Sequence, residues 1–144
     1  MPLDFNATKE LIAHRRSIKP VDMEASREVS QELLLELAEC ANWAPSHGLT
    51  EPWRFHVFQG ESRQVFAEQL QHAYKQETAE ADFKPEKHSK MGKNPLYANT
   101  VLAVVMKRDP SGKIPEVEEI EAVACAVQNL HLAASSLNLG VFWS

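Results

Sequence analysis

Two stretches of this sequence carry residue types that bind a phosphate and a planar ring. Arg15-Arg16-Ser17 supplies guanidinium groups and a hydroxyl, which hold a phosphate through charge-assisted hydrogen bonds. The second stretch, Ala44–Phe55, reads APSHGLTEPWRF. Its Gly48 and Pro52 predict a rigid turn before a strand, where side chains and backbone amides can face a ring. Together the two stretches predict redox chemistry on a bound ring.

Helices must position these stretches, and the spacing of apolar residues predicts where they lie. A first helix, capped by Asn6, ends with the two arginines, where cations suit the negative pole of the helix. A second helix begins near Ser30 and ends before Pro45, and a third contains Phe66 and Tyr74. Simple helix capping is the alternative explanation of the arginine pair.

The longest predicted helix covers Pro115–Asn138, which contains no Gly and no Pro after Pro115 itself. Its apolar residues from Ile120 to Leu137 span about 30 Å at 1.5 Å per residue. We expect it to stop at Gly140. Alanines occur all around its circumference, so we expect it to be buried on several sides. Because a single small domain scarcely covers such a helix, the pattern favours a helix-to-helix contact between two copies of the chain.

Two strands are predicted between these helices. Residues 53–58 alternate with the period of a strand that has two unlike faces, and Gly60 ends it. Residues 100–106 form an apolar run without alternation, which is typical of a central strand covered on both faces. The polar stretch 76–94 carries four lysines and is expected to be mobile or lid-like.

Composition disfavours several classes of protein. The 144 residues fit a single domain, 1–144, and a net charge of −5 with scattered basic residues disfavours nucleic acid binding. No segment approaches the ~20 apolar residues of a membrane helix, so we expect a cytoplasmic protein. The five glycines are too dispersed for a dinucleotide-binding or phosphate loop. The histidines show no metal spacing, and Cys40 and Cys125 are expected to be buried, reduced thiols.

The chain resembles the nitroreductase family of FMN-dependent oxidoreductases, most closely its smaller members, over nearly all of its length. The resemblance rests on three ordered motifs, which are Arg15-Arg16-Ser17, Ala44-Pro45-Ser46-His47 followed by Pro52-Trp53-Arg54-Phe55, and Gln128–Ala134 leading to Leu139–Trp143. It implies an α+β fold with a mixed sheet flanked by helices. It also implies a homodimer built around the long helix, with the flavin between the subunits.

By this resemblance, the flavin itself does the chemistry and no residue is assigned as catalytic. Arg15 and Ser17 would hold the FMN phosphate, with Arg16 near the ribityl chain or a flavin carbonyl. Lys19 would stabilise the reduced flavin at its pyrimidine edge, or else be an exposed loop lysine. His47 would contact the flavin, and the sequence shows no partner that would make it a general acid.

Two further positions extend the resemblance. Glu51 stands where the family more often has glutamine. Its carboxylate would repel the reduced flavin anion, so we expect Lys19 or an arginine to compensate. Phe142, Trp143 and Ser144 match a segment that, in the family's dimer, reaches the flavin from the partner subunit. Relatives continue beyond this segment with a strand and another basic phosphate ligand, so we expect a chain shortened at its carboxyl terminus.

The resemblance implies transfer of a hydride from NADH or NADPH to the flavin, and then to a nitroaromatic, a quinone or a similar acceptor, in a ping-pong cycle. Two alternatives stay open. One is a cofactor-free dimerisation or interaction module that kept only the amino-terminal part of the fold. The other is a specialised flavin enzyme of the same fold, such as one for reductive dehalogenation or flavin fragmentation.

Overall fold

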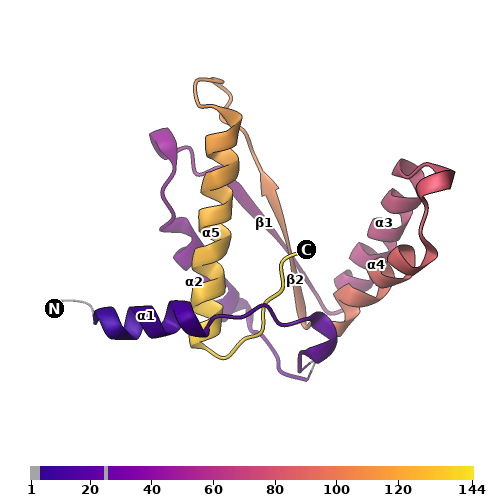
Figure 1. Cartoon of the computed structure of the whole chain (residues 1–144), viewed down its shortest axis with the longest axis horizontal. Coiled ribbons are helices and arrows are strands. Elements are labelled where there is room, and N and C mark those ends of the chain that lie inside the picture. The colour runs from indigo at the N-terminus through magenta and orange to yellow at the C-terminus, as the bar shows by residue number, and fades with distance from the viewer. Residues whose placement is uncertain (1–3, 25) are drawn as a thin grey trace. The chain divides into compact units, whose positions relative to one another are not determined.

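The computed structural model describes residues 4–24 and 26–144, and it confirms the predicted α+β class (Figure 1). Its α-helices and strands, in chain order, are α1 (Phe5–His14), α2 (Gln31–Asn42), β1 (Trp53–Gln59), α3 (Ser62–Glu77), α4 (Pro85–Tyr97), β2 (Thr100–Met106) and α5 (Glu116–Ser136). Three single 3-10 turns accompany them, η1 (Pro20–Asp22), η2 (His47–Leu49) and η3 (Glu80–Asp82).

The described chain divides into two compact units, which are considered separately below. The first unit comprises residues up to Ile18, Ser30–Phe55 and Val104–Ser144. The second comprises Lys19–Val29 and His56–Ala103. The expectation of one domain over 1–144 stays a prediction.

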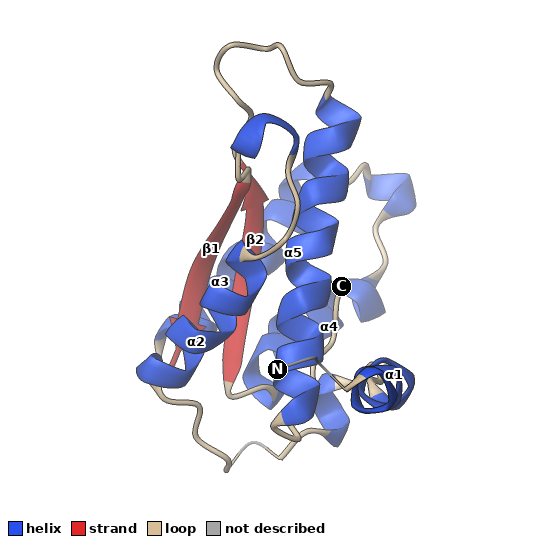
Figure 2. Ribbon diagram, turned by 90° about the vertical axis from the view of Figure 1, so that its left-hand side faces the viewer, coloured by secondary structure: helices blue, strands red, loops and turns tan. Residues whose placement is uncertain are grey.

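The sheet consists of β1 and β2, and both strands lie where the sequence predicts them (Figure 2). They are antiparallel, because the Lys107 N–H donates to the Pro52 carbonyl at 2.7 Å at one end and the Gln59 side chain reaches the Thr100 hydroxyl at 2.9 Å at the other. The expected cover on both faces of β2 is wrong for this chain, since Val104 and Val105, which point to opposite faces, are both exposed. An apolar run indicates that a strand is shielded from water. It does not indicate that the shielding residues belong to the same chain.

The core of the first unit lies between α2 and α5, which run side by side (Figure 1). The buried residues of α5 recur at helical spacing and are mostly small, so the helix approaches Leu37 and Ala41 of α2 closely. The opposite face of α5 is open, with Val117 58% and Ile120 52% exposed. The expected burial of α5 on several sides is therefore wrong within one chain, where α2 is the main packing partner of this helix and α1 and η2 make smaller contacts with it.

Helix ends follow the predicted capping rules, with two corrections. Ser30 caps α2 as predicted, its hydroxyl accepting the Leu33 N–H at 3.2 Å. The cap of α1 is Asp4 and not Asn6, because the Asp4 carboxylate accepts the N–H groups of residues 6 and 7. The last turn of α5 ends in Asn138 with φ 54°, so this asparagine, and not Gly140, takes the left-handed position.

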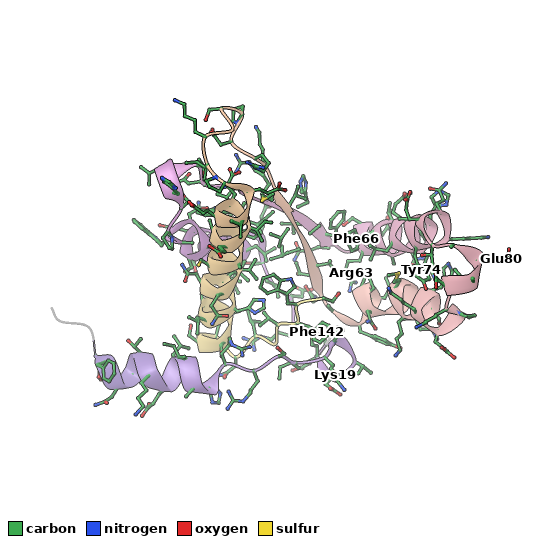
Figure 3. All side chains as sticks on the ribbon, turned by 45° about the horizontal axis from the view of Figure 1, so that its top comes forward. Lys19, Arg63, Phe66, Tyr74, Glu80 and Phe142 are labelled. Carbon is green, nitrogen blue, oxygen red and sulfur yellow. The ribbon has the colours of Figure 1, made fainter. Side chains whose placement is uncertain are left out.

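In the second unit, α3 and α4 form a helical hairpin, which corrects the expectation of a mobile stretch over 76–94. Tyr74 of α3 lies 5.3 Å from Phe83 and 6.5 Å from His88 between ring centroids (Figure 3). Arg63 donates to the Ala98 carbonyl just after α4. A few rings spaced among the lysines thus supply enough contact to fold a stretch that is polar on average.

The two cysteines are free, but both are exposed, which contradicts the expected burial. Each precedes a fully buried alanine, Ala41 on α2 and Ala126 on α5. One residue turns a helix by about 100°, so the thiols lie off the buried stripe. None of the helices in the described ranges has the length and apolar character needed to cross a bilayer.

Candidate functional site

The Arg15-Arg16-Ser17 motif lies where the end of α1 meets residues 140–143. Ser17 forms an isolated parallel bridge with Val141, and the Ile18 N–H donates to the Val141 carbonyl at 2.9 Å. Gly140 permits this approach, because a Cβ there would lie 3.2 Å from the Ile18 side chain. The requirement for Gly140 is therefore close packing, and it holds the third sequence motif beside the first.

The two arginines of the motif have different partners. Arg16 turns back onto α1 and donates to the carbonyls of Ala13 at 2.5 Å and Arg15 at 2.8 Å. Its guanidinium N–H groups thus satisfy carbonyl oxygens at the end of α1, where its positive charge also suits the negative pole of the helix. Arg15 is half-buried and lies close enough to His131 of α5 for its charge to act on the imidazole.

His131 connects Arg15 to the segment after α5. Its ring packs edge-on against Trp143, with 6.2 Å between ring centroids. Burial, and then the charge of Arg15, lower the pKa of His131 below its ordinary value. The spacing of the histidines gives His131 no metal-binding role. Only its place in the Gln128–Ala134 motif could have singled it out.

We call Arg15, Ser17, His131 and Trp143 the helix-end cluster, because they gather at the carboxyl-terminal end of α5. Trp143 remains 59% exposed, and Phe142 and Ser144 beside it are exposed as well. The described structure therefore places Phe142, Trp143 and Ser144 next to the Arg-Arg-Ser motif of the same chain. The sequence analysis expected this segment to serve the partner's motif.

The second sequence motif forms a tight loop at the other end of α5. The backbone takes positive φ at Gly48 (63°), Leu49 (53°) and Glu51 (43°), which is costly for the two residues with side chains. Two polar contacts hold the loop, from the Glu51 N–H to Ser46 Oγ at 3.2 Å and from Arg54 to the Glu51 carbonyl at 2.8 Å. The loop is therefore fixed in a strained conformation.

Two side chains of this loop stand out chemically. The His47 Nδ1 lies 2.6 Å from a carboxylate oxygen of Glu118, in the first turn of α5. The Thr50 hydroxyl is buried and, among the described residues, it is the side-chain polar atom that lacks a hydrogen-bond partner. We call His47, Thr50, Glu51 and Glu118 the helix-start cluster.

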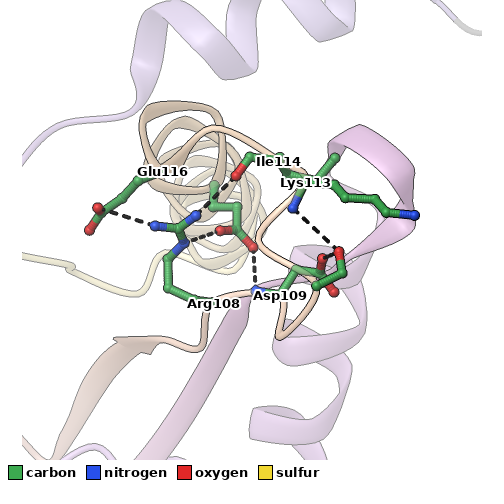
Figure 4. A network of polar contacts seen from close by, with 7 residues as sticks. Arg108, Asp109, Lys113, Ile114 and Glu116 are labelled. Atoms are coloured by element: carbon green, nitrogen blue, oxygen red, sulfur yellow. Dashed lines mark hydrogen bonds and ion pairs between the residues drawn. The ribbon is translucent and has the colours of Figure 1, made fainter.

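A polar network fixes the segment that leads into α5 (Figure 4). Glu119 is only 1% exposed, and its carboxylate accepts hydrogen bonds from the Arg108 guanidinium and, at 2.8 Å, from the Asp109 N–H. Arg108 also donates to the Ile114 carbonyl at 2.9 Å and pairs with Glu116 at 3.2 Å. The start of α5, and with it Glu118, is thereby anchored.

The two clusters lie at opposite ends of one helix. Glu118 and His131 are 13 residues apart on α5, which corresponds to about 20 Å along the helix axis. One chain thus brings Arg15, Arg16, Ser17 and Phe142–Ser144 together, and separately brings His47 and Glu51 together. Lys19 belongs to the second unit, where it precedes the turn η1.

Comparison with known proteins decides the family. The model of the nitroreductase family matches residues 12–144. The chain belongs to the nitroreductase family.

Individual proteins that are similar to this nitroreductase-family chain support the same family assignment. It is 28% identical over 134 residues to the Escherichia coli (strain K12) protein YdjA, provisionally named an NAD(P)H nitroreductase, covering 93% of this chain and 69% of that protein. A crystal structure of a nitroreductase-like family protein from Bacillus cereus matches with TM-score 0.78 and 27% identity, over 100% of this chain and 72% of that one. A nitroreductase with bound FMN from Desulfitobacterium hafniense matches with TM-score 0.67 and 27% identity, over 93% and 67%.

Proposed function

We propose that this nitroreductase-family protein is an FMN-dependent oxidoreductase that works as a homodimer. When bound, FMN would supply two-electron transfer from NAD(P)H to a nitroaromatic, a quinone or a similar acceptor. Family membership, the FMN bound to the Desulfitobacterium hafniense relative and the name of the Escherichia coli relative support this proposal. The residues at both ends of α5 fit the phosphate and the ring of the cofactor.

The helix-end cluster is the observation that carries the proposal, because it suits a phosphate. Arg15 offers a guanidinium fork and Ser17 a hydroxyl on a backbone that is fixed by pairing with Val141. Arg16 already donates to helix carbonyls, so we assign it to holding the end of α1 in place. Phe142 and Trp143 supply exposed apolar surface beside the phosphate ligands.

The helix-start cluster suits the ring. The Thr50 hydroxyl is buried without a partner in the described structure, and such an atom costs stability unless a ligand or another chain satisfies it. The exposed carboxylate of Glu51 can accept a hydrogen bond from a ring N–H. The guanidinium of Arg54, bonded to the Glu51 carbonyl, is the cation that we assign to compensate its charge.

A homodimer would unite the two clusters. If the open face of α5 packs against that of a second copy about a two-fold axis, the antiparallel helices place the start of one beside the end of the other. Each flavin would then receive its phosphate ligands and Phe142–Ser144 from one subunit, and His47, Thr50 and Glu51 from the partner. Val117 and Ile120, both exposed in the single chain, would lie in this contact.

The deciding experiment mixes the purified protein with FMN, removes free flavin by desalting, and records visible spectra before and after NADH is added without oxygen. We expect retained flavin whose absorbance bleaches with NADH. Retained flavin that NADH and NADPH leave oxidised would favour a specialised flavin enzyme. No retained flavin at micromolar protein would contradict the proposal and favour an interaction module. The matched control is Lys9→Ala on the exposed side of α1.

A further inference from the structure

We propose that His47 is the proton donor to the electron acceptor and that Glu118 is the residue that positions it. This inference rests on the proposed function, because it concerns the acceptor that the flavin reduces. The sequence offers no partner for His47, since the two residues are 71 positions apart. The fold supplies one.

The contact between the two side chains determines which ring nitrogen carries hydrogen. An ionised carboxylate has only acceptor atoms, so at 2.6 Å the Nδ1 of His47 must donate to Glu118. The other nitrogen, Nε2, has no hydrogen-bond partner among the described residues, and it belongs to a side chain that is 61% exposed. Nε2 is therefore the position from which His47 exchanges a proton with a ligand or with water.

Both members of the pair sit on anchored backbone. Glu118 lies in the first turn of α5, whose start is tied down by the buried carboxylate of Glu119. His47 lies in the strained loop, and the neighbouring Gly48 packs toward the Ile114 side chain. A pair fixed from both sides presents Nε2 in a constant direction, which general acid catalysis requires.

The chemistry of the acceptor calls for such a donor. Reduction of a quinone to a hydroquinone consumes a hydride and a proton, whereas NAD(P)H, on becoming NAD(P)⁺, supplies the hydride alone. In the proposed step His47 reacts as the imidazolium, with hydrogen on both ring nitrogens. Its Nε2–H bond breaks, the electron pair stays on Nε2, and the proton forms an O–H bond on the quinone oxygen, while Nδ1 keeps the hydrogen that it donates to Glu118. Water then returns a proton to the exposed imidazole.

Two acceptors separate proton donation from a structural role. Enzyme loaded with FMN and reduced with NADH is mixed with 1,4-benzoquinone, which needs the proton, or with ferricyanide, which takes one electron and no proton. We expect His47→Asn to slow reoxidation by the quinone about 10²-fold and Glu118→Gln to slow it about 10-fold. These factors are expressed relative to reoxidation by ferricyanide, because loss of a contact between His47 and the flavin would slow both acceptors alike. Glu36→Gln, an exposed acid on α2, is the control and should change neither rate.

A second readout needs no flavin. Nitrogen NMR of the histidine-labelled protein, recorded at a pH where histidines are neutral, should show one imidazole with hydrogen on Nδ1 alone. This is the form that His47 takes after it has donated its Nε2 proton, and it is the tautomer that is less common in water. Glu118→Ala should remove this signal. Equal slowing with both acceptors, unchanged quinone rates in His47→Asn, or absence of the Nδ1–H tautomer would each overturn the inference. If the wild-type protein retains no flavin, the proposed function is rejected, and the donor role of His47 is rejected with it. Flavin that NADH still bleaches in a variant with normal quinone rates would reject the donor role alone.

Discussion

At the scale of single residues, neighbouring arginines have separate tasks. The Arg16 guanidinium already donates to two carbonyls at the end of α1, while Arg15 lies toward His131 and the segment after α5. The phosphate of a bound flavin is therefore assigned mainly to Arg15. The motif alone does not reveal this division, because both side chains have the same chemistry.

Removal of Arg15 should weaken FMN binding. A charge-assisted hydrogen bond contributes about 1.5–3 kcal/mol, so Arg15→Ala should raise the dissociation constant of FMN roughly 10- to 100-fold. Arg15→Lys keeps the charge but loses the guanidinium fork, so its dissociation constant for FMN should lie between those of the wild type and Arg15→Ala. Quenching of flavin fluorescence measures both, with Lys9→Ala as the control. An unchanged constant in Arg15→Ala would rule out the assigned phosphate contact.

Replacement of Glu51 tests its charge. Glu51→Gln removes a carboxylate that would repel the reduced flavin, so FMN should bind more tightly and the reduction potential of the bound flavin should rise. Arg54→Gln, which removes the cation bonded to the Glu51 carbonyl, should change the potential in the opposite direction. Equilibration with a redox dye measures the potential. If Glu51→Gln changes neither affinity nor potential, this side chain does not face the ring.

His131 should make stability depend on pH. Its pKa is lowered in the folded chain by burial and by Arg15, so below about pH 6.5 the unfolded chain binds a proton that the folded chain does not. Stability is therefore lost as the pH falls below 6.5, by at most about 1.4 kcal/mol per pH unit. Urea unfolding at pH 7.5 and 5.5 should show a smaller loss in His131→Asn than in the wild type. His72→Gln, an exposed histidine, should behave as the wild type.

At the scale of elements, the segment between β2 and α5 is held by one buried acid. Glu119→Ala leaves the Arg108 guanidinium and the Asp109 N–H without their main acceptor, so it should lower the free energy of unfolding by about 3 kcal/mol. Glu116→Gln removes only an exposed ion pair and should cost less than about 1 kcal/mol. Urea unfolding compares the two variants. Equal effects would show that burial of Glu119 does not decide the stability of this segment.

The elements themselves were largely predictable, because periodicity and capping are local properties. Ser30 begins α2 as predicted, and β1, β2 and α5 lie where their patterns indicate. The local rules failed where a contact between residues far apart in the sequence determines the structure. The Tyr74 ring of α3 packs against Phe83 of the polar stretch that leads into α4. The buried stripes of α2 and α5 leave Cys40 and Cys125 outside.

The sequence motifs name candidate site residues, but they do not reveal how these residues are arranged. Three motifs identify Arg15, Ser17 and His47, because their chemistry is visible in the sequence. The pairing of His47 with Glu118 depends on the packing of a loop against a helix start, which no local pattern encodes. Likewise, the meeting of Ser17 with Val141 is a long-range backbone contact.

At the scale of the whole molecule, the open face of α5 is the proposed dimer contact. Ile120→Glu would bury a charge without a partner in this contact, so it should give a monomer. Because we propose that both subunits build each flavin site, the monomer should also fail to retain FMN. Analytical ultracentrifugation measures the mass and absorbance measures the flavin. Val65→Glu, on the exposed side of α3, is the control. A monomer that keeps flavin would refute the shared site.

The bridge from Ser17 to Val141 also bears on the order of folding. It closes a loop of 124 residues, the difference between the two positions, and such contacts form after local helices because the entropy of closing a loop grows with its length. Residue 141 must therefore leave the ribosome before the proposed phosphate ligands, Arg15 and Ser17, reach their final backbone conformation. We therefore expect FMN to bind only after this region has been synthesised. A nascent chain would lack the visible absorbance of the flavin until then.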